Sequence, residues 1–172
     1  NINKEQVAEK IVKELAKSGS VAVFRPIAPA SDEVVRRLIN AAGTDQKAED
    51  AIGVPADKFA EDAVAAEAQI VKKFGALKAA HVAVVVVGSD YDTAIAPAEL
   101  DINASLAATL NAPAVVLAGD DATAKFAAKR FEAKGVDVLA TADADAAEIA
   151  EKLATSKQAL RTPAMFEYEI NK

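Results

Sequence analysis

The sequence predicts a single α/β domain built on a parallel sheet with helices on both faces. Short apolar runs that suit buried strands alternate with longer segments whose apolar residues recur at helical spacing. This alternation is typical of a parallel sheet, because each crossover between neighbouring strands places a helix on one face. A chain of 172 residues is long enough to bury a sizeable core. We expect about four strands.

The first helix should begin almost at once, since apolar residues recur at helical spacing from Val7 to Leu15. Ser18-Gly19-Ser20 ends this helix, with glycine just past its last turn. The run from Val21 to Phe24 suits a buried strand, and Pro26 should end it because proline cannot donate to the ladder. Doubly wound domains usually start with a strand, so we expect the chain to begin after the place of a first strand.

Two more helices should precede the second strand. Ser31 is the expected N-cap of the first of them, and Gly43 closes it. The second should run from Pro55 to about Ala79, with Gly75 as a point where it could bend. Its buried side should carry Phe59, Val64, Ile70, Val71 and Phe74.

The second half of the chain repeats the alternation of strand and helix. The expected elements are a strand at His81–Val87, a loop at Gly88–Tyr91, a helix at Glu99–Leu110, a strand at Pro113–Ala118, a helix at Ala122–Lys134, a strand at Val136–Ala140 and a helix at Ala144–Leu153. Residues 1–153 are therefore the predicted domain. Residues 154–172 are predicted to be an irregular linker, in which Met165, Phe166, Tyr168 and Ile170 form an apolar cluster that packs on another domain.

Composition excludes several classes of function. The net charge of −6 and the pI near 4.9 argue against a nucleic-acid partner, which would require clustered basic charge. The chain has no cysteine, so disulfides and thiolate metal sites are excluded. No apolar run approaches the roughly 20 residues of a membrane span. We expect a cytoplasmic protein with neither nucleic acid nor membrane as partner.

The best candidate for a ligand or interface site is the carboxyl edge of the sheet, where open α/β folds place their ligands. Ser89, Asp90 and Tyr91 follow one strand there, and Arg25 follows its neighbour. Arg25 could form a structural pair with Asp90 or could bind an anion. Asp90 could cap its own turn or contact a ligand or a partner.

No catalytic or metal site is predicted. His81 is the single histidine and has neither a cysteine nor a second histidine near it in sequence, so a structural role is favoured. Four acidic residues precede predicted helices, where they stabilise the helix N-termini without any metal. They are Asp120, Asp121, Asp143 and Asp145.

A set of motifs, taken in order, resembles a known family. The motifs are Val21-Ala22-Val23-Phe24-Arg25-Pro26-Ile27, Val84-Val85-Val86-Val87-Gly88-Ser89-Asp90-Tyr91, Glu99-Leu100-Asp101-Ile102-Asn103 and Leu110-Asn111-Ala112-Pro113. They resemble the N-terminal domain of long bacterial phosphate acetyltransferases, a domain related to dethiobiotin synthetase and the P-loop fold. The tail from Leu160 to Tyr168 is similar to the linker that leads into their catalytic domain. The resemblance spans Val21 to Tyr168.

The resemblance implies a P-loop-like topology, but the first strand and the phosphate loop are missing. Asn3-Lys4-Glu5 stands at the helix start, where glycines and a hydroxyl would be needed to hold phosphate and magnesium. The catalytic domain that binds coenzyme A and acetyl phosphate is also outside this chain. The resemblance thus implies a non-catalytic regulatory or assembly domain without a cofactor of its own, whose partners are its own acetyltransferase domain and further copies of itself.

Two alternatives stay open at this point. The chain could be a stand-alone sensor that binds a metabolite at Arg25, Ser89, Asp90 and Tyr91. It could also be an ATP-dependent enzyme similar to dethiobiotin synthetase, although the missing phosphate loop argues against that function.

Overall fold

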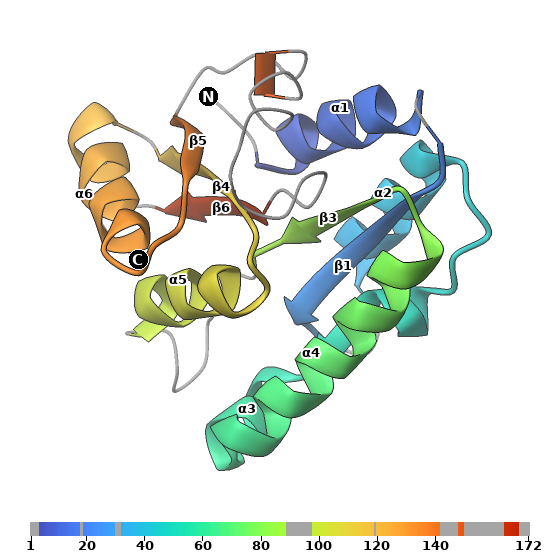
Figure 1. Cartoon of the computed structure of the whole chain (residues 1–172), viewed down its shortest axis with the longest axis horizontal. Helices are drawn as coiled ribbons and strands as arrows, with labels where there is room; N and C mark the ends of the chain where they lie inside the picture. Colours follow the sequence, from blue (N-terminus) through green and yellow to red (C-terminus); the bar gives the residue numbers. More distant parts are fainter. Residues whose placement is uncertain are drawn as a thin grey trace.

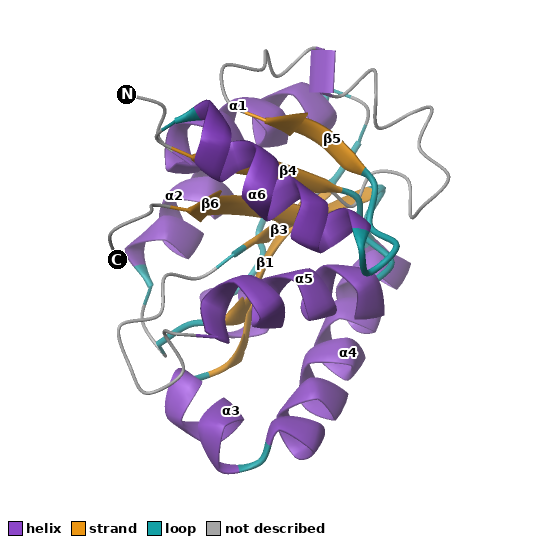
Figure 2. Ribbon diagram, turned by 90° about the vertical axis from the view of Figure 1, so that its left-hand side faces the viewer, coloured by secondary structure: helices purple, strands orange, loops and turns teal. Residues whose placement is uncertain are grey.

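The computed structural model is an α/β domain in which a parallel sheet lies between two layers of helices (Figures 1 and 2). The structure describes residues 4–17, 19–29, 32–88, 98–118, 120–141, 148–149 and 164–168. The strands are β1 (Val21–Ile27), β2 (Ile52–Val54), β3 (Ala83–Val87), β4 (Ala114–Ala118), β5 (Val138–Thr141) and β6 (Ala164–Tyr168). The helices are α1 (Lys4–Ala16), α2 (Glu33–Ala42), α3 (Ala56–Glu61), α4 (Ala63–Ala80), α5 (Glu99–Thr109) and α6 (Asp121–Glu132), with a short 3₁₀ helix, η1, at Ala48–Ala51.

The strands follow the order β2-β1-β3-β6-β4-β5, and every pairing between neighbours is parallel. The last strand, β6, therefore lies in the middle of the sheet, where Val86 pairs with Ala164 and Val116 pairs with Phe166. The predicted parallel sheet with helices on both faces is confirmed. The predicted number of about four strands is wrong, because β2 and β6 bring it to six.

The two unpredicted strands lack the continuous apolar run that marks a buried parallel strand. β2 has only three residues, with Gly53 in the middle. β6 contains Glu167 and directly follows Pro163, so its sequence is also typical of a linker. The prediction of an irregular segment after residue 154 is thus wrong for Ala164–Tyr168.

β1 continues through Pro26, which was expected to end it. The pairing of β1 with β3 stops at Phe24 and Val86, so the proline removes no donor from that ladder. On the other side β1 meets the short strand β2, where Ala28 donates a hydrogen bond to the carbonyl of Val54. The strand therefore tolerates proline where only a short edge strand faces it.

The approach of β2 to β1 is close enough to require a glycine. A Cβ built on Gly53 would lie 2.2 Å from the carbonyl oxygen of Pro26 and 3.1 Å from Cγ1 of Ile70. Lys73 of α4 donates from its ammonium group to the carbonyl oxygens of Ile52 (2.9 Å) and Gly53 (3.3 Å). The edge strand is thus held by a side chain as well as by its ladder.

Alternate residues of each strand enter two separate apolar cores, as the pleat requires. Ala22 and Phe24 face the layer that contains α3, α4, α5 and α6, and the Phe24 ring lies 6.0 Å from that of Phe74. Val21 and Val23 face the layer that contains α1 and α2. Because both faces are covered, β3 and β4 read as continuous apolar runs.

The long helix predicted from Pro55 to Ala79 is divided at Asp62 into α3 and α4. The Asp62 carboxylate accepts a hydrogen bond from the backbone N–H of Ala65 (3.1 Å), so this residue caps α4 instead of continuing α3. Val64 and Val71, which were expected on the buried side, are exposed. Among the described residues, no helix is both long and apolar enough to cross a bilayer.

Candidate functional site at the carboxyl ends of β1 and β3

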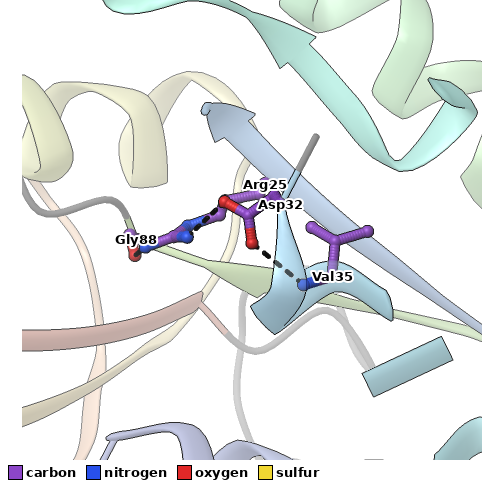
Figure 3. A network of polar contacts seen from close by, with 4 residues as sticks. All are labelled: Arg25, Asp32, Val35 and Gly88. Carbon is purple, nitrogen blue, oxygen red and sulfur yellow. Dashed lines mark hydrogen bonds and ion pairs between the residues drawn. The ribbon is translucent and has the colours of Figure 1, made fainter. Parts of the chain in front are cut away.

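Arg25 and Asp32 form a buried ion pair at the carboxyl end of β1 (Figure 3). Nη1 of Arg25 donates to Oδ2 of Asp32 at 2.6 Å, and the two side chains keep only 10% and 4% of their accessible surface. Taking two charges out of water is costly unless they face each other directly and find further hydrogen bonds. Both conditions hold here, because each partner has a second contact.

The second contact of Asp32 is with α2. Its Oδ1 accepts a hydrogen bond from the backbone N–H of Val35 at 3.1 Å, and its own backbone is extended, as an N-cap requires. The N-cap of α2 is therefore Asp32 and not Ser31, which lies outside the described residues. A carboxylate at this position also suits the positive end of the helix dipole.

The second contact of Arg25 is with β3. Nη2 donates to the carbonyl oxygen of Gly88 at 3.4 Å, directly after the last residue of that strand. One side chain thus connects β1, the start of α2 and the end of β3 (Figure 3). Nε of Arg25 is buried and has no hydrogen-bond partner in the described part of the chain.

Of the candidate residues at this edge, only Arg25 belongs to the described part of the chain, and its observed partner is Asp32. Ser89, Asp90 and Tyr91 fall outside the described residues, so the suggested pairing with Asp90 stays a prediction. The structural interpretation of Arg25 is supported, since an anion would have to compete with a carboxylate already at hydrogen-bonding distance.

Residues Met165, Phe166 and Tyr168, the predicted interdomain contacts, belong to β6. Their backbone pairs with β4, at Val115, Val116 and Ala118 respectively. Only their backbone is described, so their contact with another domain stays a prediction.

His81 is the C-terminal capping residue of α4 and precedes β3, whereas the sequence predicted it as the first residue of that strand. Its Nδ1 lies 2.9 Å from the carbonyl oxygen of Leu77, within hydrogen-bonding distance of the last helical turn. In the described part of the chain, no group of three or more histidine, cysteine, aspartate or glutamate residues could hold a metal ion.

Two polar residues with a clear positioning role were not predicted from the sequence. Asp32 follows a proline-containing loop and precedes Glu33, a position that suits an N-cap. Gln46 forms two hydrogen bonds with the backbone of Val23: its Nε2 donates to the carbonyl (2.8 Å) and its Oε1 accepts from the N–H (2.9 Å). Nothing in the local sequence of Gln46 indicates this contact, because the two residues are 23 positions apart.

No family model matches this chain. No solved structure matches it significantly either.

Proposed function

We propose that this chain is a non-catalytic regulatory or assembly domain of a phosphate acetyltransferase. The parent enzyme would interconvert acetyl-CoA and phosphate with acetyl phosphate and coenzyme A, and all of that chemistry would take place in a separate acetyltransferase domain. A P-loop-like topology without the first strand and phosphate loop belongs to the same proposal, as does a cytoplasmic location. The topology rests on the motifs between Val21 and Tyr168 and on Asn3-Lys4-Glu5 in place of a phosphate loop, and the location rests on the composition of the chain.

The observation that carries the proposal is the Arg25–Asp32 pair. Arg25 lies in the first of the family motifs, at the sheet edge where α/β enzymes usually hold their ligands. Its guanidinium is instead occupied by Asp32 and by the carbonyl of Gly88. This motif residue therefore holds three elements of the domain together, which suits a scaffold better than an active site.

The start of α1 supports the same function. Glu5 stands in the first turn of that helix, and its Oε2 accepts a hydrogen bond from Nη1 of Arg37 in α2 at 2.9 Å. A phosphate approaching this helix end would meet a carboxylate rather than the glycine amides and hydroxyl of a phosphate loop. Glu5 thus serves the contact between α1 and α2.

A metabolite-sensing role has one specific observation in its favour. Nε of Arg25 is a buried donor without a partner among the described residues, and buried donors are nearly always satisfied. A small ligand with an acceptor oxygen could satisfy it, provided that the ligand enters beside the Asp32 carboxylate. This role is compatible with regulation of an attached enzyme.

The proposal is tested by comparing three proteins: the full-length product of the gene, residues 1–172 alone, and the product without these residues. The full-length protein should release coenzyme A from acetyl-CoA in the presence of phosphate, and residues 1–172 alone should not. The product without residues 1–172 should still release coenzyme A from acetyl-CoA, but its subunit number or its response to metabolites should change. Turnover by residues 1–172 alone, or a full-length protein without turnover, would overturn the proposal.

Calorimetry with ATP and magnesium distinguishes the proposed non-catalytic domain from an ATP-dependent enzyme. No heat of binding is expected at physiological nucleotide concentrations, because Glu5 stands where phosphate would bind. Magnesium-dependent binding with micromolar affinity would instead favour an ATP-dependent enzyme similar to dethiobiotin synthetase.

A further inference from the structure

The outward face of α4 carries apolar side chains that no described residue covers. Val64 is 80% exposed and Val71 is 43% exposed. Surface helices normally place polar and charged side chains opposite their buried stripe, which in α4 is formed by Ala66, Ile70, Phe74 and Leu77. Three more residues of the outward face are small: Ala68, Gly75 and Ala79. Figure 1 shows α4 along the outside of the molecule.

Gly75 has no explanation within the described chain. It lies in the interior of an 18-residue helix, where glycine is less favourable than alanine. A Cβ built on it would meet no heavy atom within 4 Å, so close packing inside the domain does not require glycine. A glycine does allow another backbone to approach the helix closely. Gly75 therefore suits a helix surface that contacts a second helix.

The exposed charges along α3 and α4 are divided by sign. Asp57 and Glu61 of α3 and Asp62 at the junction of the two helices are exposed, and Lys58, which pairs with Glu61, is the one exposed cation of α3. Lys78 lies near the C-terminal end of α4, and Lys72 lies close to its middle. When two such surfaces meet in antiparallel orientation, the acidic end of each faces the basic end of the other. The charge pattern is thus complementary to itself under a two-fold rotation.

We propose that α4 packs antiparallel against α4 of a second copy of this chain, with the two-fold axis beside Val71 and Lys72. This register sets Gly75 opposite the second copy's Ala68, and Val64 opposite the second copy's Ala79. Small residues at the crossing point let the helices come close, while the exposed valines lose their contact with water. The contact does not depend on acetyltransferase chemistry, because any protein containing this domain would present the same face.

The dimer is tested by light scattering on residues 1–172 as the protein concentration is raised. We expect a mass approaching twice the 17.8 kDa of one chain. Gly75→Leu should raise the dissociation constant at least about tenfold, because the added side chain separates the two helices. Circular dichroism should show an unchanged fold, since the space around Gly75 within the domain is open. The matched control is Ala122→Leu at an exposed position of α6, which should leave the mass unchanged.

Charge reversal tests the antiparallel orientation. Lys78→Glu should weaken the dimer, because two acidic groups then meet, and Glu61→Lys in the same chain should restore it. Lys125→Glu on α6 is the control for net charge and should have no effect. A chain that stays monomeric at high concentration would overturn the proposal. A dimer that tolerates both Gly75→Leu and Lys78→Glu would also overturn it, because the contact would then lie on another surface. Neither result depends on an activity assay, so the function proposed above could fail while this contact stands.

Discussion

The two halves of the sheet, one at β1, β2 and β3 and the other at β4 and β5, differ in how their polar side chains are used. On the side of β1, β2 and β3, partly or fully buried side chains bind the backbone of other elements: Arg25 to Gly88, Gln46 to Val23 and Lys73 to Ile52. On the side of β4 and β5, Asn103 of α5 is also buried, but the ion pair between α5 and α6 lies at the surface. Arg130 of α6 binds Asp101 of α5 at 2.9 Å, with about half of each side chain exposed.

This difference matters because burial decides what a polar contact contributes. A buried partner that is removed leaves its neighbour without solvent and without a hydrogen bond, whereas water replaces an exposed partner. The buried contacts of the β1 side should therefore be sensitive to single polar substitutions, and the exposed ion pair of the β4 side should not. The following substitutions test this contrast in order of expected effect.

The largest effect is expected for Asp32→Ala. This change leaves the Arg25 guanidinium buried without its counter-charge and removes the N-cap of α2. Breaking a buried pair in this way costs roughly 3–5 kcal/mol of unfolding free energy. Urea unfolding followed by circular dichroism measures it.

The matched control for this pair is Asp32→Asn, which keeps an acceptor for the Val35 N–H but removes the charge. It should retain part of the lost stability. The double change Arg25→Met with Asp32→Leu should be less harmful than Asp32→Ala alone, since no unpaired charge stays buried. A wild-type unfolding curve for Asp32→Ala would contradict a structural role for the pair.

A smaller loss is expected for Gln46→Ala. The amide of Gln46 satisfies both the N–H and the carbonyl of Val23, on the edge of β1 that β2 is too short to cover. Leaving a buried backbone group unsatisfied costs about 1–3 kcal/mol. Thermal melting measures the loss, and Gln69→Ala at an exposed position of α4 is the control. Equal melting temperatures for the two variants would mean that water replaces Gln46.

The sequence was sufficient to predict the layered α/β architecture, because buried parallel strands and amphipathic helices leave strong local patterns. The run Val84–Val87 is an example, since every residue is apolar and every one is buried. Local patterns also predicted the approximate bounds of α5 and α6, and the role of Asp120 in front of α6. These features depend on neighbours within one or two turns of chain.

Features that depend on distant partners were not predictable in this way. β6 becomes a strand because β3 pairs with it on one side and β4 on the other. Both of these strands lie far from β6 in sequence. Arg25 was correctly placed at the carboxyl end of its strand, but its contact with Asp32 was not predicted from the sequence. The pairing with Asp90, which lies outside the described residues, stays a prediction.

The exposed pair of Arg130 with Asp101 should contribute less to stability than the buried pair of Arg25 with Asp32. Asp101→Ala removes the partner of Arg130, but about half of the arginine side chain already contacts solvent. Exposed pairs contribute about 0–1 kcal/mol, and added salt reduces that further. Urea unfolding at low and high salt should therefore give nearly the same free energy for the variant and the wild type. A loss as large as that of Asp32→Ala would remove the contrast between the two sides.

The last contrast concerns pH. Asp120 caps α6 by accepting hydrogen bonds from the N–H of Thr123 (2.9 Å) and from its hydroxyl (2.8 Å), and these bonds lower the pKa of Asp120 below its ordinary 3.8. A lowered pKa in the folded state means that the unfolded chain binds the proton first as the pH falls. The stabilisation is therefore complete above the ordinary pKa and is lost as the pH decreases through the folded value. Asp120→Asn keeps the acceptor but cannot titrate, so the stability difference between wild type and variant should be constant above about pH 5 and should fall below it. An NMR titration of the Asp120 carboxyl carbon measures the pKa directly, and a midpoint at or above 3.8 would contradict the assigned cap.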